Sequence, residues 1–301
     1  GAKQILATVS GAEKAAVAKA AGADATVEFA WQGQALIALE RGELDRAEAL
    51  FGKIETYAAR GQRDAMAAVA LDNQALIRLK RGDAARALDF HERAEPLFQA
   101  AGDETGVARS LGNRGTILLQ LGRLPEATAA YQAAAEWFRR LGDRQHVVAT
   151  LINLTTVAAK AGDAEGQLDA LSALTEAYRS LKDGPAALKT LQERGNLLFQ
   201  RKSFEEALAV CREHAELARE ISDLEALQGG LGNEAVALRQ LGRFAEAVAR
   251  LEEQATVCRE MGDPDLEGRS LLRRAAVLHN RLARTADAIA VTTEARALAI
   301  G

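Results

Sequence analysis

Histidine and cysteine, the side chains most often used for acid–base, metal and thiol chemistry, are few and scattered in this sequence. The two cysteines, Cys211 and Cys258, lie far apart, and so do the four histidines. The spacing gives no HExxH motif, no CxxC motif and no Cys–His neighbours, so it supports neither a metal site nor an activated thiol. We therefore expect a chain that is not an enzyme and needs no cofactor. The histidines are His91, His146, His214 and His279.

A second set of polar residues recurs at a fixed spacing. Asparagine returns at intervals of 40 residues, or twice that, at Asn73, Asn113, Asn153 and Asn233. Asparagine is a poor helix former, so its recurrence within predicted helices calls for another reason. Its amide has one acceptor and two donors on a short stem, which suits pairing with another chain or bridging to a neighbouring helix.

The composition indicates which elements carry these residues. The chain has 301 residues, of which 48% are hydrophobic but only 4% are aromatic, and it contains just 4 prolines. The apolar residues are mostly Ala and Leu, which suit closely packed helices. A β-rich protein would be expected to show more β-branched, aromatic and turn-forming residues. The composition therefore predicts an all-α protein.

Charge and hydropathy exclude some partners. The formal net charge is -4, whereas nucleic-acid and membrane-surface binders usually carry a basic excess. No apolar run approaches the roughly 20 residues of a membrane span. We expect no nucleic-acid or membrane partner, and a cytoplasmic location because the cysteines form no disulfide framework. Because the chain begins at Gly1 and not at a methionine, we also expect it to be a piece of a longer protein.

An internal repeat of 40 residues dominates the chain. In most units a glycine follows an apolar helix end and precedes a new helix. Lys202 takes this place in the fifth unit and Leu282 in the last, which carries one extra residue. The glycines in this phase are Gly42, Gly82, Gly122, Gly162 and Gly242.

A second series of turns lies half a period away, and it pairs glycine with aspartate. Gly102–Asp103, Gly142–Asp143 and Gly262–Asp263 are examples, and Gly61 begins the series. Glycine can adopt the left-handed conformation that ends a helix, and aspartate can cap the next helix. Each unit is therefore predicted to hold two helices, A and B. We expect a non-repeat segment over residues 1–23 and a solenoid over 24–301, with units 24–62, 63–102, 103–142, 143–182, 183–222, 223–262 and 263–301.

The apolar pattern within the units predicts how the helices pack. Helix A carries leucine at one phase and a small residue four positions later, as in Leu111 and Gly115. Helix B opens with alanine and carries a larger residue four positions later, as in Ala127 and Tyr131. Large and small residues on facing helices can interlock, so each unit buries its neighbour. His91 and Cys211 fall at this packing position of helix B, and we expect both in the core.

This order of residues resembles the tetratricopeptide repeat, most clearly in the segment SLGNRGTILLQLGRLPEATAAYQAAAEWFRRLGD that begins at Ser110. The period resembles the long-helix subclass found in kinesin light chains, Pins-type adaptors and bacterial peptide sensors. The resemblance covers about residues 24–301. It implies a right-handed superhelical solenoid of about seven two-helix units, whose A helices line a concave groove that holds a protein or peptide.

The same resemblance implies that the recurrent asparagines face that groove and clamp an extended chain. The alternative is that they cap or bridge adjacent A helices. Arginines and other polar residues at neighbouring phases would then set specificity, and a partner with acidic residues would suit them because arginine binds carboxylates with two hydrogen bonds. These charges could equally be solvated and balanced by nearby acids. The candidate groove residues are Asn73, Asn113, Asn153, Asn233, Arg109, Arg114, Lys189, Asn196, Arg269 and Arg273.

The first 29 residues do not follow the period. They predict a strand at 4–10, a helix at 12–21 and a short strand at 26–29. The segment resembles a fragment of the cofactor domain of quinone-oxidoreductase-type dehydrogenases, in which residues matching Ser10 and Lys14 lie near the NADPH 2′-phosphate. No glycine-rich loop precedes it, so a working cofactor site is not expected. The segment is either the end of a preceding reductase-like domain or a cap on the first repeat.

Three functions remain open from the sequence. The chain could be a scaffold that binds an extended peptide segment of a partner protein. It could instead be a regulator that changes its superhelical pitch on binding a small peptide, or an accessory domain of a larger reductase-like protein. The sequence sets neither the partner nor the oligomeric state.

Overall fold

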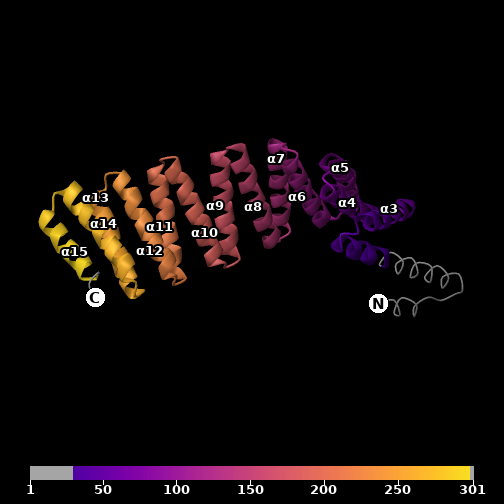
Figure 1. The fold of residues 1–301 in the computed structure, drawn as a ribbon. Coiled ribbons are helices and arrows are strands. Elements are labelled where there is room, and N and C mark those ends of the chain that lie inside the picture. The colour runs from indigo at the N-terminus through magenta and orange to yellow at the C-terminus, as the bar shows by residue number, and fades with distance from the viewer. Residues whose placement is uncertain (1–29, 299–301) are drawn as a thin grey trace. The chain divides into compact units, whose positions relative to one another are not determined.

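The computed structural model describes residues 30–298, and all regular secondary structure in this range is α-helical (Figure 1). A helix at residues 30–40 comes first. It is followed by α3 (Leu44–Arg60), α4 (Asp64–Lys80), α5 (Ala84–Ala100), α6 (Glu104–Gln120), α7 (Leu124–Arg140), α8 (Arg144–Ala161), α9 (Ala164–Ser180), α10 (Gly184–Gln200), α11 (Phe204–Glu220), α12 (Leu224–Gln240), α13 (Phe244–Glu260), α14 (Pro264–Leu282) and α15 (Thr285–Leu298). The even-numbered helices are the A helices of the repeat and the odd-numbered ones the B helices.

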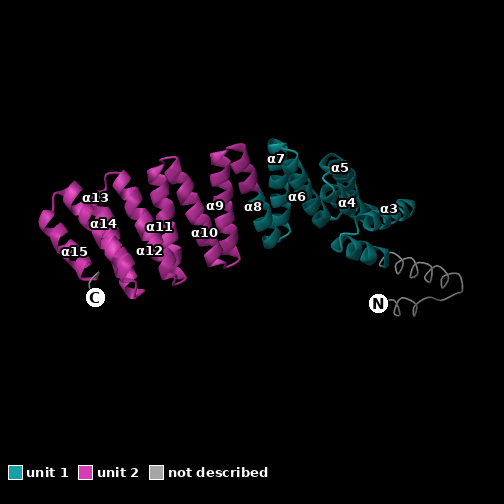
Figure 2. Ribbon diagram, viewed as in Figure 1, with its two compact units in different colours: residues 1–153 teal, residues 154–301 magenta. Residues whose placement is uncertain are grey.

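The chain divides into two compact units, residues 1–153 and residues 154–301 (Figure 2). Within the first unit, α3 to α7 pack in chain order, each against the helix before and the helix after it. Within the second unit, α9 to α15 pack in the same way. Both units are therefore stacks of antiparallel helix pairs, which confirms the predicted all-α solenoid architecture.

The turns between helices follow the predicted period even where glycine is missing. The glycines of both series have positive φ angles, for example 71° at Gly122 and 67° at Gly102. Lys182, Lys202 and Ser222 adopt the same left-handed conformation, at φ angles of 58°, 59° and 59°. The period therefore fixes the backbone turn, and the side chain at that position adapts to it.

Two turns differ from the predicted pattern. The left-handed residue of the first half-period turn is Gln62, at φ 53°, and not Gly61. At the last turn, α14 runs on to Leu282 and the left-handed residue is Ala283, at φ 52°. The extra residue noted in the sequence thus lengthens an A helix instead of enlarging a loop.

Aspartates cap the A helices as predicted. The Oδ1 atom of Asp103 accepts a hydrogen bond of 2.8 Å from the backbone N–H of Gly106, three residues into the helix. Asp183, Asp223 and Asp263 do the same for α10, α12 and α14. Each cap satisfies a donor that the first helical turn cannot use.

The core is built from the predicted interlocking of large and small side chains. Tyr131 on α7 is only 1% exposed, and a Cβ atom at Gly115 on α6 would lie 2.8 Å from its ring. The leucines of the A helices are buried throughout the described units: Leu71, Leu111, Leu151, Leu191, Leu231 and Leu271. His91 and Cys211 are buried as predicted, at 2% and 4% exposure.

The predicted strands and helix of the N-terminal segment, with Ser10 and Lys14, lie outside the described residues. Among the helices that the structure describes, none is both long enough and apolar enough to cross a membrane.

Candidate functional site

Two adjoining hollows open along the A helices of the second unit, on either side of α12. The first, which we call the arginine hollow, has a volume of about 470 Å³ and is lined mainly by α12 and α14. The second, the lysine hollow, has a volume of about 380 Å³ and is lined mainly by α10 and α12. Gln228, Gly229 and Asn233 of α12 line both hollows. We call the two hollows together the groove of the second unit.

Helix α12 is rich in glycine where it meets its neighbours. A Cβ atom at Gly230 would lie 2.9 Å from Nδ1 of His214 on α11. A Cβ atom at Gly232 would lie 2.7 Å from Nε2 of Gln254 on α13. Glycine inside a helix costs about 0.5–1 kcal/mol relative to alanine. The two glycines therefore leave room for polar side chains that reach α12 from the B helices behind it.

Gln254 ties α13 to the groove surface of α12. Its side chain is 4% exposed, and its Nε2 atom donates a hydrogen bond of 2.9 Å to the backbone carbonyl of Gln228. The same nitrogen lies 3.2 Å from the side-chain Oε1 atom of Gln228. These contacts hold the Gln228 side chain at the place where the two hollows meet.

His214 of α11 lines the lysine hollow and is 9% exposed. Burial lowers the pKa of this imidazole, partly offset by the nearby Asp223 carboxylate. Its Nδ1 atom has no hydrogen-bond partner among the described residues. The ring therefore contributes a neutral surface to the groove near neutral pH.

The arginine hollow is positively charged and contains no acid. Its lining includes Arg239, Arg269 and Arg273, together with the amides of Gln228 and Asn233. In the part of the chain that the structure describes, none of the three arginines forms an ion pair. Arg269 donates only to a backbone carbonyl of its own helix, through Nε at 3.3 Å. Three guanidinium groups without carboxylate partners around one hollow can bind an anionic group.

The lysine hollow has mixed charge. Lys189 of α10 lies on one side, and Asp223 and Glu225 lie at the start of α12 on the other. One ligand crossing both hollows would therefore meet a cationic surface at one end and a mixed one at the other.

Four of the predicted site residues meet in this groove. Asn233 lies between the hollows, Lys189 lines one of them, and Arg269 and Arg273 line the other. Asn196 is exposed on α10 but lines neither hollow. These four predicted residues therefore lie on one hollowed surface of the second unit.

The other predicted residues lie in the first unit. Asn73 is half-buried and donates through Nδ2 to the carbonyl of Val69 in its own helix, at 2.8 Å. Arg109 and Asn113 are exposed, and Asn153 is half-buried. Arg114 packs against the B helix before it, where its Nη1 atom lies 3.4 Å from a carboxylate oxygen of Glu95. Its counterparts Arg194 and Arg274 likewise contact glutamates on B helices.

Among the groove residues that were not predicted, three stand at positions that are apolar in the preceding repeats. Arg239 occupies a position that is Leu79, Leu119, Ala159 and Phe199 in the preceding units. His214 and Gln254 occupy a B-helix position that is Ile54, Ala94, Ala134 and Leu174 in the preceding units. These polar residues stand around α12 at positions that are apolar in the preceding units, although the last unit also has polar residues there, His279 and Glu294.

A buried trio of Asp72, His91 and Ser110 lies in the first unit, but its geometry does not suit catalysis. Both Asp72 Oδ1 and Ser110 Oγ approach the same imidazole nitrogen, Nδ1 of His91, at 2.8 Å and 3.3 Å. A proton relay needs the serine and the carboxylate on opposite nitrogens of the ring. All three side chains are at most 5% exposed, so substrate cannot reach them.

Metal and thiol chemistry find no support in the described region. No group of three or more His, Cys, Asp or Glu side chains there could hold a metal ion. Burial raises the pKa of the Cys211 thiol to about 12, with a smaller contribution from Glu234, so the nucleophilic thiolate is strongly disfavoured.

A comparison with protein families supports the repeat seen in the sequence and the structure. Residues 106–183 match the tetratricopeptide repeat family. No curated protein matches the sequence.

Several solved structures are similar to this chain. One is a Signal Transduction ATPase with Numerous Domains protein with a tetratricopeptide repeat sensor from Pyrococcus horikoshii, at TM-score 0.51 and 13% identity, covering 89% of this chain and 42% of that one. Another is the apo form of RapI, at TM-score 0.51 and 12% identity, covering 90% and 98%. At such low identity the likeness shows the fold. With the 40-residue period and the family match over residues 106–183, it shows a helical solenoid of the tetratricopeptide repeat type.

Proposed function

We propose that this protein binds an extended, acidic peptide segment of a partner protein in the groove of the second unit. The acidic residues of the peptide bind Arg239, Arg269 and Arg273, and its backbone pairs with the amide of Asn233. The protein acts by holding its partner and has no catalytic activity of its own. We place it in the cytoplasm, where its two free thiols stay reduced.

The observation that carries this proposal is the set of three arginines without ion pairs around one hollow. Several other exposed arginines of the second unit have acidic partners; for example, Arg219 pairs with Glu253, and Arg243 pairs with Glu246 at 2.6 Å. Leaving three like charges together without counter-ions is unfavourable, and a bound anion removes that repulsion. The hollow is also open and elongated by the adjoining lysine hollow, which suits an extended chain better than a compact ligand.

Two alternative functions remain as proposals: a regulator that senses a small peptide, and an accessory domain of a larger reductase-like protein. A regulator that changes shape on binding would compact in solution X-ray scattering when the peptide is added, whereas a scaffold would not. An accessory role in a reductase would require a dinucleotide-binding unit encoded upstream of Gly1. No feature of the described residues favours either one over the scaffold.

Peptide selection tests the proposed function. The full chain is used to select peptides from a random library displayed on phage. We expect the selected sequences to be enriched in Asp and Glu, and their binding to be lost in the Arg269→Gln/Arg273→Gln variant. The matched control is Arg139→Gln/Arg140→Gln, which makes the same charge change at exposed positions of α7. Selected peptides without acidic residues, or equal binding by both variants, would overturn the proposal.

A further inference from the structure

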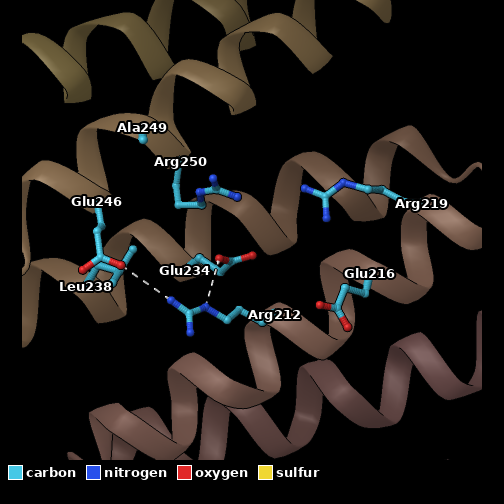
Figure 3. A pocket seen from close by; sticks show the side chains of 8 residues that line it. All are labelled: Arg212, Glu216, Arg219, Glu234, Leu238, Glu246, Ala249 and Arg250. Carbon is cyan, nitrogen blue, oxygen red and sulfur yellow. Dashed lines mark ion pairs between the residues drawn. The ribbon is translucent and has the colours of Figure 1, made fainter.

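A third hollow lies between the B helices α11 and α13, and it is chemically unlike the groove. Its volume is about 290 Å³. Figure 3 shows Glu234 of α12 at its centre, with Arg212 and Arg219 of α11 and Arg250 of α13 around it. Glu234 directly follows the groove residue Asn233, so consecutive residues of α12 line two different hollows. We call this one the glutamate hollow.

Glu234 places a negative charge at a position where three other repeats carry arginine. Its counterparts at 40-residue intervals are Gln74, Arg114, Leu154, Arg194 and Arg274. The four polar counterparts each contact a glutamate on a B helix. These contacts are Gln74–Glu55 at 2.7 Å, Arg114–Glu95 at 3.4 Å, Arg194–Glu213 at 3.8 Å and Arg274–Glu252 at 3.0 Å.

The carboxylate of Glu234 lines the hollow without accepting a hydrogen bond. The residue is 3% exposed, and its nearest cation is Nε of Arg212, 3.8 Å from Oε2. No described residue donates a hydrogen bond to it. Because this carboxylate lines the hollow and accepts no hydrogen bond, it is free to accept one from a ligand. Burial raises the pKa of this carboxyl, although the three arginines oppose the shift.

The arginines of the glutamate hollow retain free donors. Arg219 and Arg250 are both held by Glu253, Arg250 through Nη1 at 2.7 Å, and Figure 3 shows their side chains turned toward one another. Each guanidinium has five N–H donors, so most of them remain available. The hollow therefore offers a carboxylate that lacks donors beside two guanidinium groups that have donors to spare.

We propose that the glutamate hollow binds a free α-amino acid, with the ammonium group on Glu234 and the carboxylate on Arg219 and Arg250. The lining carries three arginines and three glutamates, so it presents both of the charges that a zwitterionic ligand needs. Leu238 and Ala249 provide an apolar wall for the side chain of the amino acid. The volume lies near the lower limit of about 300 Å³ for small-molecule sites, which fits a ligand of this size.

Isothermal titration calorimetry of the full chain tests this site. The probes are glycine, alanine, valine, leucine, glutamate and lysine. The N-acetyl and methyl ester derivatives of the tightest binder then remove the ammonium and carboxylate charges in turn. We expect at least one free amino acid to bind, and each derivative to bind about tenfold or more weakly, because a hydrogen bond to a charged group is lost.

Variants test whether the amino acid binds in the glutamate hollow and not in the groove. They also test whether Glu234 binds the ligand or has only a structural role. Glu234→Gln keeps the shape of the side chain, and Arg250→Gln removes the opposite charge. Both should weaken binding about tenfold or more. Glu220→Gln, an exposed change on α11 outside the hollow, and Arg269→Gln/Arg273→Gln in the groove should bind the amino acid as the parent does. The proposal is overturned if no probe binds at millimolar concentrations, or if Glu234→Gln and Arg250→Gln both bind like the parent.

Discussion

The Nδ1 atom of His91 lies 2.8 Å from the Oδ1 atom of Asp72, and both side chains are buried, at 2% and 5% exposure. The contact joins the B helix α5 to the A helix α4 before it. Ser110 of the following A helix, α6, also donates to Asp72 Oδ1, at 3.2 Å. One carboxylate oxygen thus connects three successive helices.

Removing Asp72 is expected to destabilise the first unit strongly. In the Asp72→Ala variant, His91 and Ser110 lose their shared acceptor inside the core, which costs about 3 kcal/mol. Urea denaturation followed by circular dichroism measures the change. The double variant Asp72→Ala/His91→Leu should lose less than the sum of the single changes, because the two side chains form one interaction. Additive losses would show that the pair is not coupled.

Gly115→Ala is expected to destabilise the protein although alanine is the better helix former. The gain in helix propensity is about 1 kcal/mol. The added methyl group would lie 2.8 Å from the Tyr131 ring, whose hydroxyl is tied to Thr116 at 2.9 Å and cannot move freely. Overpacking of this kind costs about 1–3 kcal/mol, so we expect a net loss. Gly33→Ala, where no atom lies within 4 Å of the added Cβ, is the control and should not destabilise.

Lys202→Gly is expected to stabilise the protein by about 0.5–1 kcal/mol. The left-handed conformation costs a residue with a Cβ atom about 1–2 kcal/mol, and the greater freedom of glycine in the unfolded chain offsets part of this gain. Lys202 has a φ angle of 59°. Lys53→Gly, at an exposed position inside α3, should instead lower stability by about 1 kcal/mol. The melting temperatures of the two variants measure these effects. If both changes raised the melting temperature, or both lowered it, the left-handed turn at Lys202 would be contradicted.

The Cys211 thiol is expected to resist labelling by a disulfide reagent in the folded protein. Burial raises its pKa from 9.0 to about 12, so between these values the folded state keeps a proton that the unfolded state releases. Stability should therefore fall as the pH rises above 9. Labelling of the Cys258→Ala variant should be slow in buffer and accelerate with urea. Fast labelling without urea would contradict the buried position of the thiol.

The period allowed most of the fold to be predicted. The two turns of each unit, the aspartate caps and the interlocking of Gly115 with Tyr131 follow from glycine, aspartate and size patterns that repeat along the chain. The lengthening of α14 could not be predicted, because one extra residue can enter a helix or a loop and the sequence does not distinguish them. The shift from Gly61 to Gln62 has a different cause: position 62 keeps the 40-residue phase of Gly102, but the glycine one residue earlier was read as the turn.

The groove was only partly predictable. Asn233, Arg269 and Arg273 were found because they stand at a recurrent phase of the A helices. Arg114 was grouped with them by its spacing from Arg109, but a helix turns about 100° per residue and its side chain reaches Glu95. His214 and Gln254 were missed because they come from B helices and reach the groove only through the space that Gly230 and Gly232 leave, a packing detail that needs coordinates.

The most direct test of the groove is a fluorescence anisotropy titration with one labelled acidic peptide taken from the selection. The peptide is titrated with the parent chain, with Arg269→Gln/Arg273→Gln and with the control Arg139→Gln/Arg140→Gln. We expect the groove variant to bind at least about tenfold more weakly than the other two, and the affinity of the parent to fall with added salt. Equal affinities for all three proteins would contradict the assignment of the groove as the binding site.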